Sequence, residues 1–256
     1  MKKNLNWVLA AILICGASVF TSCNKPNTEL SNKVQGKWIV ADLDGEACPT
    51  SLKSVVTFES ATKGYYSISE NITMTWEDKT PVEVTFHENG FTAIEEDGIY
   101  TSVLTATVNS ITDNEMRLTT EWTLTGGTEV LLHEFYNERW VRVTDDFEQS
   151  VIGTWEAQVQ NENKQQTWRW EFKADGTYVF SLKDGDSWQV FEDEMSEYFV
   201  DGSLLCTRWK NTAESDEERD WWEIESIQDG TMKWTALRMD EDLTTHTETL
   251  VLNKIQ

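Results

Sequence analysis

Basic residues are scarce in this chain of 256 residues. It carries 21 Lys and Arg against 45 Asp and Glu, a formal net charge of −24 with histidine neutral. A surface of that sign repels polyanions, so nucleic acid and anionic lipid are poor partners. The acidic runs at 192–194 and 216–218 are better explained as solvated loops than as an ion site.

Residues that commonly carry catalysis are few or badly spaced. His87, His133 and His246 fall on three different predicted strands without metal-ligand spacing. The sequence has no Ser-His-Asp order, no glycine-rich phosphate loop and no C-x-x-C motif, and its acids are too numerous for any one carboxylate pair to be informative. It therefore predicts a protein that is not an enzyme and that binds no metal and no cofactor.

Cysteine is also rare, with four in the chain. Cys15 and Cys23 belong to the N-terminal segment, and only Cys48 and Cys206 lie in the body of the chain. A disulfide between these two would join a loop of the first half to a strand of the second. Two partly buried thiols are favoured, although a disulfide is permitted outside the cytosol.

The N-terminus has the three parts of a secretion signal. Lys2 and Lys3 are followed by an apolar run over 7–20 and by Thr21-Ser22-Cys23. Phe20-Thr21-Ser22-Cys23 resembles the lipobox of bacterial lipoproteins, which implies cleavage before Cys23 and acylation of that cysteine. The alternative is an ordinary signal peptide with a stray cysteine.

From the lipobox we expect a signal peptide over 1–22 and a lipidated N-terminus with a polar tether over 23–33. The resemblance predicts a protein anchored in the bacterial cell envelope through Cys23, at the outer membrane. Which side of the membrane it faces, and its oligomeric state, stay open.

The rest of the chain contains an internal repeat. Gly36-Lys37-Trp38 recurs as Gly153-Thr154-Trp155, with the two tryptophans 117 positions apart. The segment 108–116 recurs as 224–232 at an offset of 116. A nearly constant offset indicates a duplicated domain, which we place at 34–145 and 150–256.

Both repeats read as short strands separated by turn residues, without convincing helical period. In the first repeat we expect strands at 36–42, 54–59, 65–69, 72–77, 82–87, 91–95, 101–109, 115–124 and 130–143. With nothing helical to cover a sheet, closure into a barrel is the way to remove its edges. The predicted fold is all-β, with two consecutive small antiparallel barrels of about eight strands each.

A G-x-W at the entry to the first strand of an eight-stranded meander resembles the lipocalins, and a repeated, lipid-anchored version resembles the lipocalin-like domains of Gram-negative lipoproteins. The resemblance implies two calycin-type barrels. It makes Gly36, Trp38, Gly153 and Trp155 the barrel-closing residues. It also implies a basic side chain that packs over the tryptophan of each G-x-W segment. In the first unit this residue is Arg139 or Arg142, and in the second it is Lys254. Both units are shorter than a typical lipocalin and lack the helix that usually follows the barrel.

Tryptophan is unusually frequent, with 13 in the chain, of which eight fall in the second repeat. Trp168 and Trp170 alternate onto one face of a strand, while Arg169 and Glu171 take the other. Adjacent Trp221 and Trp222 must face opposite ways. The tryptophans either fill a core or line a cavity, and the candidate ligand-binding residues are Trp168, Trp170, Trp209, Trp222 and Trp234.

These features favour a lipocalin-like envelope lipoprotein that binds a small apolar or aromatic molecule, with the second unit as the binder. One alternative is a lipoprotein whose exposed tryptophans contact carbohydrate. Another is a structural or assembly partner that has no small-molecule ligand.

Overall fold

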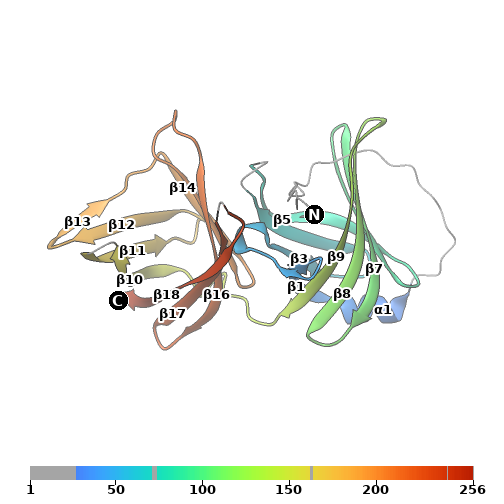
Figure 1. Cartoon of the computed structure of the whole chain (residues 1–256), viewed down its shortest axis with the longest axis horizontal. Helices are drawn as coiled ribbons and strands as arrows, with labels where there is room; N and C mark the ends of the chain where they lie inside the picture. The colour runs from blue at the N-terminus through green and yellow to red at the C-terminus, as the bar shows by residue number, and fades with distance from the viewer. Residues whose placement is uncertain (1–26, 71–73, 162–163, 241, 256) are drawn as a thin grey trace. The chain divides into compact units, whose positions relative to one another are not determined.

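The computed structural model describes residues 27–70, 74–161, 164–240 and 242–255 (Figure 1). The predicted signal peptide and Cys23 lie outside these residues. The chain divides into two compact units: the first extends to Arg142 apart from Pro49–Ser51, and the second comprises Pro49–Ser51 and the chain from Val143 onward. None of the described helices is long and apolar enough to cross a membrane.

The first unit is a closed antiparallel barrel of eight strands, seen at the right of Figure 1. Its sheet runs β2-β1-β3-β4-β5-β6-β7-β8-β9, and an additional pairing of β1 with β9 closes the ring, with the short β2 outside it. Its elements are α1 (Thr28–Val34), β1 (Gly36–Leu43), β2 (Glu46–Ala47), β3 (Ser54–Phe58), β4 (Lys63–Ser69), β5 (Trp76–Phe86), β6 (Gly90–Asp97), β7 (Tyr100–Ile111), β8 (Glu115–Gly126) and β9 (Glu129–Val143). Between β2 and β3 the chain forms the short 3-10 helix η1 (Thr50–Leu52), whose first two residues are assigned to the second unit.

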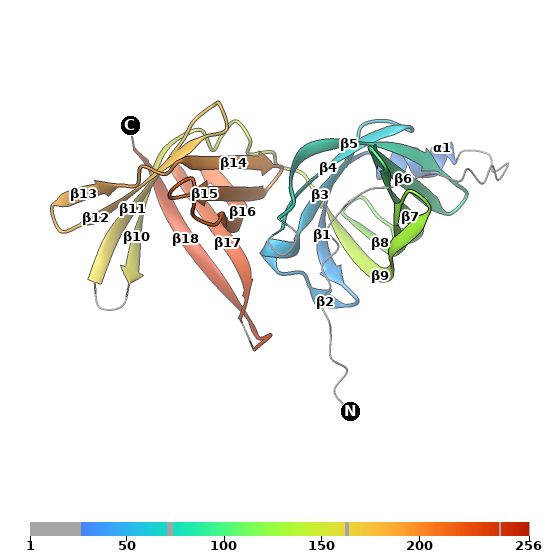
Figure 2. The same cartoon turned by 90° about the horizontal axis from the view of Figure 1, so that it is seen from above.

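The second unit is a single curled sheet in the order β13-β12-β11-β10-β18-β17-β16-β15-β14 (Figure 2). Its first and last strands pair, as they do in the first unit. Its elements are β10 (Gly153–Asn161), β11 (Lys164–Phe172), β12 (Tyr178–Asp184), β13 (Ser187–Val190), β14 (Met195–Asp201), β15 (Leu204–Lys210), β16 (Glu218–Gln228), β17 (Thr231–Met239) and β18 (Thr245–Ile255).

The predicted all-β fold of two consecutive barrel-like units is confirmed, with one difference in closure. In the second unit the outer edge of β12 pairs with β13, from Ser181 opposite Val190 to Asp184 opposite Ser187. In the part of the chain that is described, β12 and β14 meet only near a single bridge, Thr177 to Glu197. The added hairpin therefore takes up the edge that would close the sheet, and the unit is curled with an opening at its side.

The duplication is visible in backbone detail. β7 and β8 shift register between Val108 and Ser110, and β16 and β17 shift register between Ile224 and Ser226. The strands after these bulges are anchored alike, because the Arg142 N–H donates to Asn114 O (2.9 Å) and the Lys254 N–H donates to Gly230 O (2.8 Å). A bulge is a local choice of the chain, so its recurrence at an offset of 116 supports a common origin of the two units.

The last part of the predicted polar tether forms the helix α1, which the sequence, without convincing helical period, does not indicate. The Asn27 side chain caps this helix by accepting the Leu30 N–H (3.0 Å). Leu30 and Val34 are buried in the core of the first unit, 8% and 0% exposed. Only two apolar residues, four positions apart, mark its buried face, which is too short a pattern to indicate a helix.

Two predicted strands, 72–77 and 82–87, are one strand in the structure, β5, as far as the described residues show. Asp78-Lys79-Thr80-Pro81 resembles a turn, and Lys79 does adopt a left-handed φ of 55°. The pairing with β4 shifts register opposite this point, between Tyr66 and Ile68, and then continues through Pro81. The turn-like sequence is therefore an irregularity within a strand. Cys48 and Cys206 are both buried, and no disulfide joins them.

Candidate functional site

The second unit encloses a stack of aromatic rings contributed by β11, β12, β16 and β17. The Trp234 ring lies at its centre, 5.2 Å from Trp170 and 5.6 Å from Trp222 between centroids. Trp168 meets Trp170 at 5.9 Å and Phe180 edge-on at 5.8 Å. Aromatic pairs of this geometry contribute about 0.5–1.5 kcal/mol each beyond the burial of their surface.

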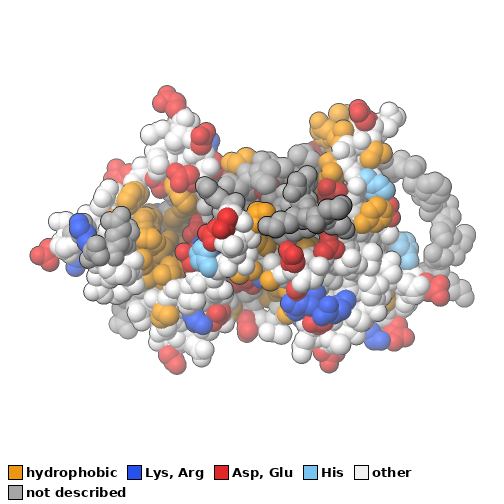
Figure 3. Space-filling model, viewed as in Figure 1, with side chains coloured by type: hydrophobic (Ala, Val, Ile, Leu, Met, Phe, Trp, Pro, Cys, Tyr) orange, Lys and Arg blue, Asp and Glu red, His pale blue; other side chains and the backbone are white. Residues whose placement is uncertain are grey.

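Burial divides the stack into a floor and a wall. Trp170, Trp222 and Trp234 are 9%, 6% and 1% exposed and belong to the core of the unit. Trp168 and Phe180 are only partly buried and pack against that core from one side. Figure 3 shows hydrophobic side chains gathered in a hollow of this unit, at the left of the view near β11 and β12. The rings therefore form a filled floor beneath a partly open aromatic wall.

Four of the five candidate tryptophans come together in this stack, and Trp209 does not. Trp209 is half-buried near the end of β15 and makes no ring contact with the other four among the described residues. Trp188 lies on the opposite face of the sheet, where the Arg169 guanidinium stacks 3.7 Å from its ring centroid. Trp222 belongs to the core and Trp221 does not, as their adjacent positions require, although Trp221 is only 8% exposed.

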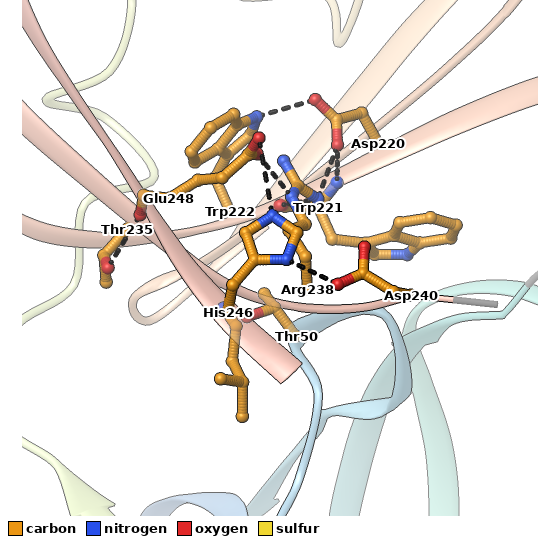
Figure 4. Close-up of polar contacts among 10 residues, drawn as sticks. Thr50, Asp220, Trp221, Trp222, Thr235, Arg238, Asp240, His246 and Glu248 are labelled. Atoms are coloured by element: carbon orange, nitrogen blue, oxygen red, sulfur yellow. Dashed lines mark hydrogen bonds and ion pairs between the residues drawn. The ribbon is translucent and has the colours of Figure 1, made fainter. Parts of the chain in front are cut away.

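A polar cluster adjoins the stack where β16 and β17 separate (Figure 4). The paired register of these strands begins at Glu223 opposite Thr235, so the residues before Glu223 and after Thr235 are splayed apart. Arg238 bridges the splay by donating from Nη1 to Trp221 O (3.0 Å) and to Asp220 Oδ1 (2.8 Å). Its Nε also donates to Glu248 Oε2 (2.8 Å).

The polar cluster and the aromatic stack are in direct contact. The Arg238 guanidinium carbon lies 4.4 Å from the Trp222 ring centroid, a cation–π geometry. The Trp222 indole N–H donates to Asp220 Oδ2 (2.7 Å), and the Trp221 backbone N–H donates to Asp220 Oδ1 (2.9 Å). Burial raises the pKa of Asp220, with Arg238 acting in the opposite direction. We call Asp220, Trp222, Arg238 and Glu248 the rim.

Tyr178 on β12 is another buried group of this unit. Burial is the main cause that raises the pKa of its phenol, and the charges of Asp193, Asp220 and Glu218 raise it further. The neighbourhood combines stacked indoles, one guanidinium and several carboxylates.

The barrel-closing residues predicted from the sequence have matching surroundings in the two units. Trp38 and Trp155 are both 0% exposed, and their indole N–H groups donate at 2.7 Å to the carbonyls of Val34 and Val151. Gly36 and Gly153 have φ of 111° and 132°, values that L side chains rarely adopt.

A base covers each of these tryptophans. The Arg142 guanidinium carbon lies 4.1 Å from the Trp38 ring centroid, and Lys254 Nζ lies 5.0 Å from that of Trp155. Of the two candidates in the first unit, the base over the ring is thus Arg142. Arg139 instead pairs with Asp42 and Glu115.

The interior of the first barrel is polar above its aromatic floor. Glu138 accepts the Trp140 indole N–H (2.6 Å) and the Thr120 hydroxyl (2.5 Å), and burial raises its pKa. Glu95 accepts the Tyr66 hydroxyl (2.9 Å), and its pKa is also raised, mainly by burial. Neither carboxylate forms an ion pair with a base in the described ranges. This lining differs from the indole-rich interior of the second unit.

Phe180, Asp220 and Arg238 belong to the candidate site but are not among the residues predicted from the sequence. Alternation on strands could have indicated each of them, because Phe180 follows Tyr178, Asp220 precedes Trp222 and Arg238 follows Trp234 by even steps. Their recognition also requires the strand pairing, which brings β16 and β17 together. No group of three or more His, Cys, Asp or Glu side chains that could hold a metal ion is found among the described residues.

Comparison of the sequence with models of known protein families and with characterised proteins found no match. The closed eight-stranded barrel and the curled second sheet are consistent with a lipocalin-like arrangement.

Proposed function

We propose that this protein is a lipocalin-like lipoprotein of the bacterial cell envelope, anchored through Cys23, whose second unit binds a small apolar or aromatic molecule. The observation that carries the proposal is the partly open aromatic wall of Trp168 and Phe180 above the floor of buried tryptophans. Ligand sites in barrels are apolar, aromatic-lined and accompanied by a few polar groups, as this one is.

The side opening supports a route of entry. The β13 hairpin leaves β12 and β14 joined near a single bridge, so the wall lies beside an interruption of the sheet. A barrel whose only task was to fill its interior would gain stability from closing that edge. The retained opening is better explained by access to the interior.

Two other functions were considered from the sequence. A carbohydrate-contacting surface needs tryptophans exposed on one outer face, whereas most of the described rings of the second unit point into the core. A structural or assembly role without a ligand is favoured by one observation, the dense packing of Trp170, Trp222 and Trp234. It is the second candidate.

Tryptophan fluorescence of the full chain tests the proposal. Titration with a panel of apolar and aromatic molecules is expected to quench the emission, and Trp168→Ala is expected to weaken binding without unfolding the unit. Trp188→Ala removes a ring from the opposite face of the same sheet and serves as the matched control. If lipids, aromatic metabolites and oligosaccharides all leave the emission unchanged, the role without a ligand takes the place of binding.

A further inference from the structure

The rim places a charged group on the aromatic stack of the second unit. Arg238 lies over Trp222, Trp222 lies against Trp234, and Trp234 lies against Trp170. The rim is therefore at the Trp222 end of this row of rings, and a molecule that lies along the row would meet the rim at that end. The charge of the rim then decides which polar groups are accepted.

The charge of the rim is negative. The Arg238 guanidinium already has two carboxylate partners, Asp220 and Glu248, so its positive charge is more than compensated. An anionic group brought beside the rim would be repelled by these carboxylates at short range.

The rim and the stack also offer hydrogen-bond donors without a partner. Arg238 uses Nε and Nη1 in its bonds, which leaves Nη2 free of hydrogen bonds within the described chain. The Trp234 indole nitrogen is buried and has no hydrogen-bond partner in the same residues. A buried donor left unpaired is costly, and a hydroxyl or carbonyl oxygen of a ligand would satisfy it.

We infer that the second unit selects a neutral or cationic amphiphile with a planar apolar body and discriminates against the corresponding anion, an inference that rests on the proposed function. The rings of Trp168, Trp170 and Phe180 receive the apolar body. The rim carboxylates accept hydrogen bonds from a hydroxyl or an ammonium group of the ligand. The Arg238 Nη2 group donates a hydrogen bond to an oxygen of the ligand. The discrimination comes from Asp220 and Glu248, which keep Arg238 from acting as an anion receptor.

A matched series of three probes tests the inference by isothermal titration calorimetry on the full chain: 2-naphthalenemethanol, 2-naphthylmethylammonium and 2-naphthoate. They share one aromatic body and differ in charge. We expect the alcohol and the ammonium to bind at least about tenfold more tightly than the carboxylate. In Asp220→Asn/Glu248→Gln the carboxylate is expected to gain affinity and the ammonium to lose it.

The control is Glu171→Gln/Asp216→Asn, which removes the same charge from two exposed positions of the same unit. It separates the effect of the rim from that of the overall charge, and it should leave the order of the probes unchanged. If the Asp220 variant does not fold, Glu248→Gln alone carries the comparison, since the Glu248 side chain is 47% exposed. Equal or tighter binding of the carboxylate by the wild-type chain would overturn the inference and leave the proposed function standing. Failure of all three probes to bind would overturn the inference for this aromatic body, and the fluorescence panel would then decide the proposed function separately.

Discussion

The guanidinium of Arg142 covers the indole ring of Trp38 at 4.1 Å, and it is held there by three backbone carbonyls. Its nitrogens donate to Asp113 O (2.5 Å), Gln35 O (2.7 Å) and Lys33 O (2.8 Å). The equivalent base of the second unit, Lys254, donates to one carbonyl, Ile152 O (3.1 Å). Both units therefore place a basic side chain over the G-x-W tryptophan, and the one in the first unit is held by more hydrogen bonds.

This difference predicts unequal costs of removing the two bases. Arg142→Ala should lower the free energy of unfolding of the first unit by about 1.5–3 kcal/mol, because charged hydrogen bonds and a cation–π contact are lost together. Lys254→Ala should cost the second unit about 1 kcal/mol or less, because one long hydrogen bond and a more distant ring contact are lost. Urea unfolding, followed by signals assigned to each unit, measures both. A larger cost for Lys254→Ala would contradict the comparison.

The two buried tryptophans of the G-x-W segments should be essential to their own units. Trp155→Ala is expected to cost about 3–5 kcal/mol, enough to unfold the second unit while the first stays folded. Near-ultraviolet circular dichroism and hydrogen exchange resolved by segment would show which unit is lost. A cost below about 1 kcal/mol would mean that this fully buried ring does not support the core.

The partly buried carboxylates of the first barrel predict stability that falls as pH rises. The pKa of Glu138 is raised above its ordinary value of 4.5, so at intermediate pH the folded unit holds a proton that the unfolded chain has released. The resulting stability is fully present below about pH 4.5 and is lost as pH rises through the raised pKa, with Glu95 acting in the same direction. Each unit of pKa shift corresponds to about 1.4 kcal/mol.

Glu138→Gln isolates this effect. Its amide can accept the Trp140 N–H and donate to Thr120, as the protonated acid would. The variant should be more stable than the wild type at pH 8 and should depend less on pH between 5 and 8. Thermal unfolding of the first unit provides the measurement, with exposed Glu129→Gln as the control for net charge. An unchanged pH profile in Glu138→Gln would assign the dependence to other groups.

The proposed lipid anchor at Cys23 predicts a clear change in fractionation. Cys23→Ala should release the protein from membranes or leave its signal uncleaved, because the acyl chains supply the attachment. Membrane fractions and the intact mass of the protein would report both effects. Retention of the variant at the wild-type level would rule out attachment through Cys23.

The sequence was sufficient for the fold class because the barrel is specified by local patterns. The alternation of Trp168 and Trp170 and the G-x-W segments are patterns of neighbouring residues, and the offset between the two halves is read directly from the sequence. The helix α1 was missed because its buried face consists of Leu30 and Val34 alone. The incomplete closure of the second sheet was missed because it depends on whether β12 pairs with β13 or with β14, a competition between distant segments.

The candidate site was predictable only in part. Trp168, Trp170, Trp222 and Trp234 were indicated by their number and alternation, and the strand pairing brings them into one stack. Trp209 has the same composition signal but lies outside that stack, since alternation gives the face of a residue and not its neighbours. The rim was not predictable because Asp220 and Arg238 meet only where β16 and β17 splay.

Native mass spectrometry of the full chain purified from bacteria tests the central claim, that the second unit holds a small molecule. We predict a retained mass beyond that of the protein and the proposed lipid on Cys23, present in Trp188→Ala and lost or reduced in Trp168→Ala. A spectrum in which wild type and both variants carry no additional mass, together with an unresponsive tryptophan emission across the ligand panel, would contradict the claim.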